Sequence, residues 1–242
     1  MHIKDKILMD KEELEREGPI TVVVFGDSVT HGALLFENNY ETVYWNRLRK
    51  KILQIRDYVP INIINAGIGG TSATTSVGRV EKQVLAYNPD LIIICFGLND
   101  VNYELEVWLG SLKCIFKKCL SCGADVIFMT PNMLNTYVAE DTLEEIKDYA
   151  YITAEYQNSG RMDIYMKAAV ELAKGMGVET CDCYAEWKKL SQTQDTTKLL
   201  INRINHPTAE MHELFANCLF DVLFPSKEIR NTSRESMMYE KK

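Results

Sequence analysis

Five short apolar runs, separated by amphipathic stretches, constrain the fold of this chain more than any other feature of its sequence. The runs are rich in Val and Ile and lack a clean two-residue alternation, which is typical of strands buried on both faces of a parallel sheet. They comprise residues 20–25, 61–65, 91–96, 126–130 and 178–181. The stretches between them place apolar residues three or four apart, which predicts helices. The clearest predicted helices are 40–55, 76–87, 105–120, 162–176 and, with Pro207 in its first turn, 207–224.

Strands that alternate with helices predict an α/β fold in which a parallel sheet is wound on both faces. With 242 residues, the chain has room for one large domain, which we expect at residues 20–224. Residues 1–19 are interpreted as an N-terminal extension and residues 225–242 as a polar, flexible tail. Residues 132–160 interrupt the alternation, and they are either an ordinary helical insertion or a lid over the substrate.

Composition and charge exclude some classes of function. The net charge of −7 argues against nucleic acid as the main partner, because a phosphate backbone attracts basic surfaces. No apolar stretch reaches the roughly 18 residues that a membrane span needs, so we expect no stable membrane association. The first ten residues lack the apolar core of a signal peptide, which predicts a cytoplasmic protein.

The cysteines predict free thiols and not a disulfide framework, because their number is odd and their spacing is irregular. They are Cys95, Cys114, Cys119, Cys122, Cys181, Cys183 and Cys218. Cys119 and Cys122 have the spacing of half a zinc site, but the pair Cys181 and Cys183 does not match it. We therefore expect neither a metal site nor a cofactor.

Residues with catalytic potential follow the first three predicted strands and open the last predicted helix. The first strand ends in Gly26-Asp27-Ser28, the second in a glycine-rich run that includes Gly70, and the third leads to Asn99. His206 precedes the last helix. Because the carboxyl ends of parallel strands share one edge of the sheet, these residues are expected to meet there.

Each of these four features has an alternative interpretation. Asn99 and Asp100 could cap a following helix, and a lone histidine is more often structural. The glycine-rich run approaches a dinucleotide-binding fingerprint, but Ser72 stands where the third glycine is required. The elbow of the α/β-hydrolases is not matched either, because Thr30 replaces its second glycine.

Taken together, the four features resemble the sequence blocks of the GDSL/SGNH-family hydrolases over residues 21–220. The resemblance implies a three-layer α/β/α sandwich whose five-stranded parallel sheet has flavodoxin-like order. It makes Ser28 the nucleophile and His206 the general base. It also implies an oxyanion hole formed by the N–H groups of Ser28 and Gly70 and the side-chain amide of Asn99.

The chain departs from the family pattern beside the histidine. The family usually has an aspartate three residues earlier, where this chain has Arg203. Three outcomes are open: a backbone carbonyl near Asn202 orients His206, the side chain of Asn202 or the distant Asp195 does so, or the enzyme is weak or inactive. A Ser-His dyad is our working hypothesis.

The resemblance implies a serine-dependent carboxylester hydrolase that removes a short acyl group, such as acetyl, from a carbohydrate or another small ester. A lysophospholipase or a thioesterase of the same fold is an alternative within this class. A sugar-binding module with a degenerate site is the alternative from another class, and Arg203 motivates it.

Overall fold

The computed structural model describes residues 2–225, and its centre is a five-stranded parallel sheet. The strand order is β2-β1-β3-β4-β5, which confirms the predicted α/β fold and its flavodoxin-like order. The strands are β1 (Ile20–Gly26), β2 (Ile61–Asn65), β3 (Leu91–Cys95), β4 (Asp125–Met129) and β5 (Glu179–Cys181). Each lies within one residue of the predicted run at both ends, because these apolar segments are long enough only for strands.

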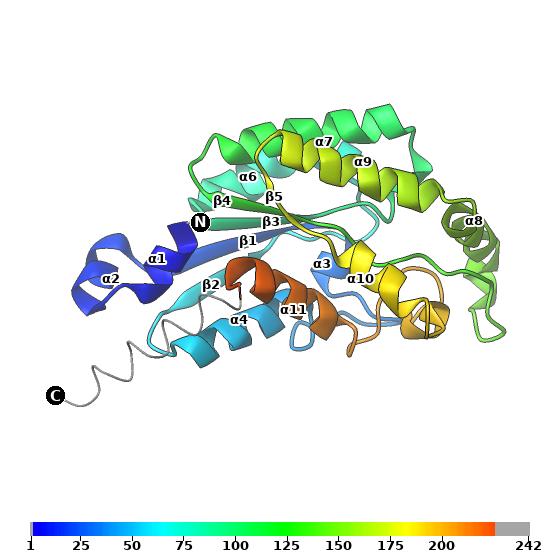
Figure 1. Ribbon diagram of the computed structural model, residues 1–242, viewed down its shortest axis with the longest axis horizontal. Coiled ribbons are helices and arrows are strands. Elements are labelled where there is room, and N and C mark those ends of the chain that lie inside the picture. Colours follow the sequence, from blue (N-terminus) through cyan, green and yellow to red (C-terminus); the bar gives the residue numbers. More distant parts are fainter. Residues whose placement is uncertain (1, 226–242) are drawn as a thin grey trace.

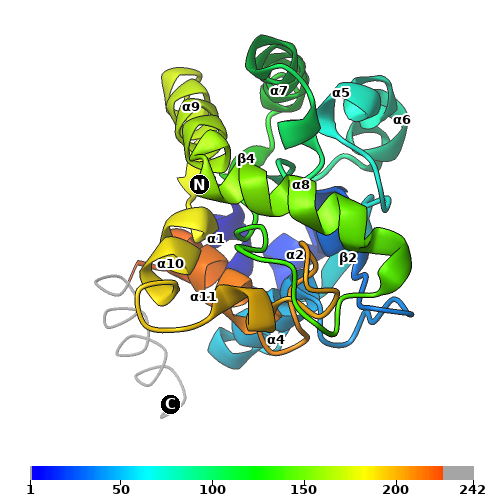
Figure 2. The same ribbon diagram turned by 90° about the vertical axis from the view of Figure 1, so that its right-hand side faces the viewer.

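Helices cover both faces of the sheet and give it three layers (Figure 1). One face carries α5 (Ala73–Ser76), α6 (Val80–Gln83), α7 (Leu105–Leu120) and α9 (Arg161–Gly175). The other carries α3 (Ser28–His31), α4 (Tyr44–Ile55), α10 (Cys183–Leu190) and α11 (His212–Leu223). Figure 2 shows α8 (Lys147–Asn158) lying across the end of the molecule at which the strands finish.

The N-terminal helices α1 (His2–Leu8) and α2 (Lys11–Glu17) lie at the opposite end of the sheet (Figure 1). Ile3 and Ile7 are buried there among the core residues. Lys6 forms an ion pair with Asp90 at 2.8 Å, just before β3. Residues 2–8 therefore pack against the domain at the edge that is remote from the strand ends.

The core lies between the sheet and its two helical layers. All five residues of β3 are fully buried, as expected for a central strand covered on both faces. Trp108 and Phe116 of α7 fill one layer, and Trp187 of α10 and Phe215 of α11 fill the other. This packing holds the strand ends, and hence the loops that follow them, in fixed positions.

Three predicted helices differ from the structure. The one predicted at 40–55 begins only at Tyr44, as α4. The segment 76–87 breaks into α6 between two 3₁₀ turns, Val77–Arg79 and Leu85–Tyr87. Gly78 and the valines lower helix propensity there. The last helix begins at His212 and not at Pro207, because Pro207 forms an isolated antiparallel bridge with Leu200.

Other segments match the sequence predictions or lie beyond them. α7 has the predicted bounds, and two further 3₁₀ turns outside the site occur at Glu144–Ile146 and Thr196–Leu199. The predicted tail lies outside the described residues, except for Pro225. Among residues 2–225, no helix combines the length and the apolar character that a membrane crossing requires.

Candidate active site

Ser28 lies directly after β1, where the chain turns into the short helix α3. The Oδ1 atom of Asp27 accepts a hydrogen bond from the N–H of Val29 at 3.0 Å and so caps this helix. Only 6% of Ser28 is exposed. The local sequence thus produces a rigid strand-to-helix turn with the serine at its first helical position.

Asp27 itself is fully buried, and its Oδ2 atom has no hydrogen-bond partner among the described residues. Burial raises the pKa of this carboxyl group to about 7. Asp100 lies in a similar environment, and its pKa is also raised to about 7, by burial first and by the charge of Asp27 as well. Two carboxyl groups that resist ionisation therefore lie buried near Ser28.

His206 contacts Ser28 directly. Its Nε2 atom lies 2.9 Å from the Oγ atom of Ser28, and its Nδ1 atom lies 3.1 Å from the backbone oxygen of Leu34. A carbonyl oxygen can only accept, so this second bond requires the proton on Nδ1. The Nε2 atom is then left as the acceptor for the hydroxyl proton of Ser28, which is the arrangement of a general base.

The half-buried imidazole favours its neutral form. Burial lowers the pKa of His206 below 6.5, and the bond to Leu34 opposes this only in part. A histidine that is neutral at neutral pH is able to accept a proton. The geometry and the electrostatics of this pair therefore agree.

The group that orients His206 differs from the predicted ones. A backbone carbonyl does so, but it belongs to Leu34 and does not lie near Asn202. Asp195 instead accepts hydrogen bonds from the hydroxyl of Tyr137 at 2.6 Å and from the N–H of Thr197 at 3.2 Å. No side-chain pattern signals a carbonyl acceptor 172 residues away, so sequence reasoning could not find Leu34.

Asn202 shapes the loop that carries His206. Its Oδ1 atom accepts hydrogen bonds from the N–H groups of Ile204, Asn205 and His206, at 3.1, 2.9 and 2.9 Å. Asn202 therefore acts on the backbone of the loop and not on the imidazole. Its side chain accepts the hydrogen bonds of three successive backbone N–H groups, which in a helix or strand would go to backbone carbonyl oxygens.

Arg203, at the position of the family's aspartate, points to the segment 132–160. It binds both carboxylate oxygens of Asp141, with its Nη2 atom 2.8 Å from Oδ2. Its backbone has φ 59°, a left-handed conformation that is uncommon for a residue other than glycine. The arginine thus has a structural contact of its own in this chain.

The segment 132–160 supports the His206 loop at two further points. The Nδ2 atom of Asn132 donates to the backbone oxygen of Asn205 at 2.9 Å. The N–H of Asn135 donates to the backbone oxygen of Ile204, also at 2.9 Å. The segment therefore buttresses the loop that holds the histidine; whether it also covers the substrate stays a prediction.

Gly70 and Asn99 lie in the loops that follow β2 and β3, the two neighbours of β1. The Nδ2 atom of Asn99 donates to the backbone oxygen of Thr71 at 2.9 Å, which fixes its amide beside Gly70. Asn99 stands before the 3₁₀ turn Asp100–Asn102 but makes no capping bond to it, so the capping interpretation is wrong for its side chain. One amide hydrogen of Asn99 is left for another acceptor.

The glycine-rich loop lies tightly against α3. A Cβ atom at Gly67 would overlap the backbone of Thr30 and His31, so only glycine allows this approach. The N–H of Ile68 donates to the backbone oxygen of Gly26 at 3.1 Å, and Asp100 accepts from the N–H of Ala73 at 2.7 Å. The loops after β1, β2 and β3 are thereby joined into one unit.

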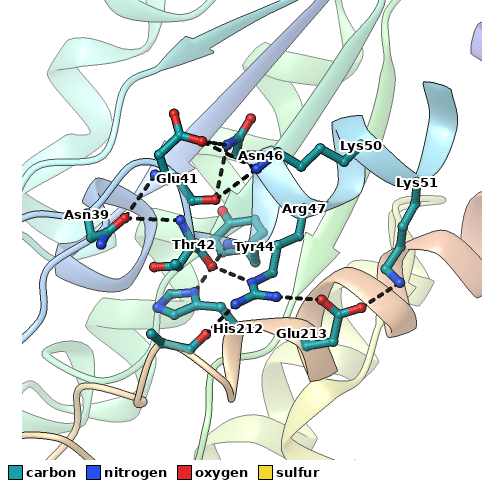
Figure 3. Close-up of polar contacts among 11 residues, drawn as sticks. Asn39, Glu41, Thr42, Tyr44, Asn46, Arg47, Lys50, Lys51, His212 and Glu213 are labelled. Carbon is teal, nitrogen blue, oxygen red and sulfur yellow. Dashed lines mark hydrogen bonds and ion pairs between the residues drawn. The ribbon is translucent and has the colours of Figure 1, made fainter. Parts of the chain in front are cut away.

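A polar network fixes the other side of α3, where α4 meets the start of α11 (Figure 3). Arg47 binds Glu213 at 2.8 Å, and Glu213 also pairs with Lys51 at 2.6 Å. The Nδ1 atom of His212 accepts from the N–H of Tyr44 at 3.3 Å, and the hydroxyl of Tyr44 lies 3.0 Å from the Oγ1 atom of Thr30. This chain of contacts ties α11 to the helix that carries Ser28.

No group of three or more His, Cys, Asp or Glu side chains within residues 2–225 is arranged to hold a metal ion. A hydroxyl, a neutral imidazole that accepts its proton and a set of N–H donors are the components of acyl transfer through a serine.

Ser28 and His206 thus form a hydroxyl–imidazole pair at the carboxyl edge of a parallel sheet, and comparison with known proteins identifies the family. The model of the GDSL-like lipase/acylhydrolase family matches residues 24–214, from β1 into α11. The match covers most of the chain, so the protein belongs to this family and is a carboxylic ester hydrolase.

Solved structures with similar folds include Axe2, an acetylxylan esterase from Geobacillus stearothermophilus, at a TM-score of 0.65 and 19% identity. The alignment covers 85% of this chain and 94% of that one. LAE5, an α/β hydrolase enzyme from the metagenome of Lake Arreo, Spain, aligns with a TM-score of 0.64 and 19% identity, over 84% of this chain and 94% of LAE5. At these identities the likeness concerns the fold.

A curated relative is the uncharacterized lipoprotein YqeF of Bacillus subtilis (strain 168). It is 34% identical to this chain over 87 residues. The match spans 36% of this chain and about a third, 34%, of that protein.

Proposed function

We propose that this protein removes a short acyl group, acetyl in the first place, from a carbohydrate ester, with Ser28 as the nucleophile. The observation that carries the proposal is the 2.9 Å contact between Nε2 of His206 and Oγ of Ser28, in the tautomer that the bond to Leu34 requires. A serine hydroxyl becomes an effective nucleophile only when a base takes its proton in this way.

In the proposed reaction, Ser28 attacks the ester carbonyl as His206 takes its proton. The oxyanion is stabilised by the N–H groups of Ser28 and Gly70 and by the free amide hydrogen of Asn99. One such donor is worth about 10²–10³-fold in kcat in other serine hydrolases. His206 then protonates the leaving alcohol, and water attacks the acyl-enzyme with His206 again as the base.

The proposal needs no aspartate behind the histidine. Catalytic mutants of Axe2 include the substitution of an aspartate, whereas Arg203 stands at the family's aspartate position here. The oxygen of Leu34 provides the acceptor for Nδ1–H that an aspartate would otherwise provide. A neutral carbonyl stabilises the imidazolium less than a carboxylate does, so we expect a lower kcat than a complete triad would give.

The chemistry of the acyl-enzyme is tested with p-nitrophenyl acetate and a fluorophosphonate probe. The wild-type protein is expected to hydrolyse the ester and to be labelled at Ser28, and Ser28→Ala is expected to lose both properties. Thr208→Ala, a substitution in the same loop region outside the dyad, is the matched control. Equal hydrolysis by the wild type and Ser28→Ala, or an unlabelled wild type, would support the sugar-binding module instead.

The length of the acyl group is tested with p-nitrophenyl esters from acetate to octanoate. We expect kcat/KM to fall as the acyl chain lengthens. A maximum at octanoate would contradict the acetyl assignment and favour the lysophospholipase or thioesterase of the same fold.

The carbohydrate part of the proposal draws on the loop that orients His206. Phe36 is 81% exposed and Tyr40 50% exposed, on the same loop as Leu34. Exposed aromatic side chains beside a site offer flat apolar surface to a ligand. Phe36→Ala is expected to raise KM for an acetylated xylooligosaccharide and to leave p-nitrophenyl acetate hydrolysis unchanged. An unchanged KM for the sugar ester would remove this support.

A further inference from the structure

Three cysteines come together at the β5 edge of the sheet. Cys181 ends β5, Cys183 begins α10, and Cys218 lies on α11. The Sγ atoms of Cys181 and Cys183 are 3.6 Å apart, and Cys218 lines the same surface hollow as Cys181. Three separate elements thus bring these cysteines together, and none of the three takes part in the proposed ester hydrolysis.

Only one of the three thiols is open to a reactant. Cys181 is 1% exposed and Cys183 is fully buried, whereas Cys218 is half-buried. Cys218 lines a surface hollow of about 860 Å³ together with Lys189, Met211 and Leu214. Cys181 lines the same hollow but is 1% exposed, so a small molecule that enters the hollow has better access to Cys218 than to Cys181.

The surroundings also distinguish Cys218 as the thiol that ionises. Hydrogen bonds from Cys181 and Cys183 lower the pKa of Cys218, and the charge of Lys189 acts in the same direction. Burial raises the pKa of Cys183. Acidic side chains, among them Glu186 and Asp221, line the same hollow, and negative charges do not favour a thiolate. The neighbouring thiols of Cys181 and Cys183 are therefore the main cause of the lowered pKa of Cys218. The thiolate is the nucleophilic form of cysteine.

We propose that Cys181, Cys183 and Cys218 form a peroxide-reactive site in which Cys218 is oxidised and one of the two buried thiols then forms a disulfide with it. The Cys218 thiolate attacks one oxygen of hydrogen peroxide and the O–O bond breaks; the hydroxide that leaves takes up the proton that the thiol gave up on ionising and becomes water. This gives a sulfenic acid. The sulfur of Cys181 or Cys183 attacks the sulfenic sulfur and releases a second water. Two thiols lose two hydrogen atoms in all, and one peroxide becomes two waters.

The other cysteines of the chain provide matched controls. The Sγ atom of Cys122 is exposed but donates to the backbone oxygen of Cys119 at 3.1 Å. Cys114 is half-buried like Cys218, and Cys95 is buried. Exposure alone would favour oxidation of Cys122, whereas the neighbouring thiols of Cys181 and Cys183 favour Cys218.

The test treats the full-length protein with hydrogen peroxide and maps its cysteines by mass spectrometry without reduction. We expect a pair of peptides linked through Cys218 and either Cys181 or Cys183, with a mass two hydrogen atoms below the sum of the two reduced peptides. Dithiothreitol is expected to restore the reduced peptides. We also expect Cys218 to react about tenfold faster than Cys122. Faster oxidation of Cys122 or Cys114, or a Cys218 that stays reduced in excess peroxide, would overturn the proposal.

Variants separate the two chemical steps. Cys218→Ser is expected to abolish the linked peptide, while Cys122→Ser leaves it unchanged. With both buried thiols replaced, in Cys181→Ala/Cys183→Ala, Cys218 is expected to be oxidised more slowly, because the thiols that lower its pKa are gone. In excess peroxide its sulfenic acid is still expected to form, to persist without a partner thiol and to be trapped by dimedone. Because both variants are checked for native circular dichroism first, loss of the trapped adduct in a folded double variant would contradict the assignment. The same experiments in Ser28→Ala are expected to give the same result, since this site does not use the ester chemistry.

Discussion

His206 and His212 are six residues apart in the sequence and have opposite environments in the fold. His206 is half-buried, and its Nδ1 atom donates to the oxygen of Leu34, so that Nε2 is free to accept from Ser28. His212 is 1% exposed, and its Nδ1 atom accepts from the N–H of Tyr44, which requires the opposite tautomer. Burial lowers both pKa values, that of His212 to about 3.

This comparison shows that the partner of one ring nitrogen decides what a histidine does. A carbonyl partner at Nδ1 creates a base at Nε2, while an amide partner at Nδ1 uses up the lone pair in a structural bond. His206 and His212 share the residue type and a lowered pKa. The position of each ring relative to β1 is what differs, and it comes from the turn between Pro207 and α11.

The largest effect is expected from His206→Ala. Removal of the base should lower kcat for p-nitrophenyl acetate about 10²–10⁴-fold, while the free energy of unfolding stays close to that of the wild type. Steady-state kinetics and urea denaturation measure the two quantities. Comparable activity in His206→Ala and the wild type would remove His206 from the mechanism.

Asn202→Ala is expected to have the second largest effect on activity. Three backbone N–H groups lose their acceptor, and the loop that carries His206 relaxes. The resulting misalignment of the imidazole with the hydroxyl of Ser28 should lower kcat about 10–10²-fold. KM should change little, because the substrate contacts are elsewhere. Asn202→Asp keeps the accepting oxygen and serves as the control with the smaller loss; an unchanged kcat in Asn202→Ala would show that the loop is held without it.

His212→Leu should reverse the pattern seen for His206. The N–H of Tyr44 becomes a buried donor without an acceptor, which costs about 1–3 kcal/mol in the free energy of unfolding. The kcat of the folded fraction should stay within a few-fold of the wild type. His212→Asn, whose Oδ1 atom can accept the same bond, should lose less stability. A folded His212→Leu protein without activity would break the distinction between the two histidines.

The pH dependence of kcat/KM should follow His206 and not His212. Burial lowers the pKa of His206 below 6.5, so the neutral base is present at neutral pH and activity is lost only when the pH falls below 6.5. His212 is protonated far lower, near its pKa of about 3. A pH-rate profile whose acidic limb lies above pH 6.5 would contradict the environment assigned to His206.

The smallest effect is expected from Asp141→Ala. Its ion pair with Arg203 is largely exposed on the aspartate side, at 63% of the side chain, and water screens such pairs so that they contribute little to stability. Thermal unfolding should shift only slightly and kcat should be unchanged. A loss of activity as large as that of Asn202→Ala would show that Arg203 positions the histidine loop.

Much of the fold was predictable because it rests on local patterns. The five strands were identified from buried Val and Ile runs, and α7 from its apolar spacing, to within a residue. The segment 76–87 was not, because Gly78 and neighbouring valines weaken a helix that apolar periodicity alone favours. The start of the last helix was misplaced because the bridge between Leu200 and Pro207 joins residues that no periodicity links.

The candidate site was predictable in its side chains and not in its backbone partners. The pairing of Ser28 with His206 followed from their places after the strands and from the family resemblance, and the structure brings them into contact. The sequence left open that the side chain of Asn202 orients the imidazole of His206. In the structure this side chain accepts hydrogen bonds from backbone N–H groups of the loop, including that of His206. Leu34 was missed because every residue has a carbonyl oxygen, so the sequence carries no mark of the one that is used.

The sequence by itself determined the order of strands and helices and the residue types that reach the edge of the sheet, since both depend on local hydrophobicity and on residue identity. The tertiary structure alone decided which histidine contacts Ser28, which carbonyl holds its other ring nitrogen, and that Cys181 and Cys218 line one hollow with Cys183 beside them. The physical reason is that these properties depend on distances between segments that are far apart in the chain. Packing of α3, α11 and β5 sets those distances, and no local pattern records them.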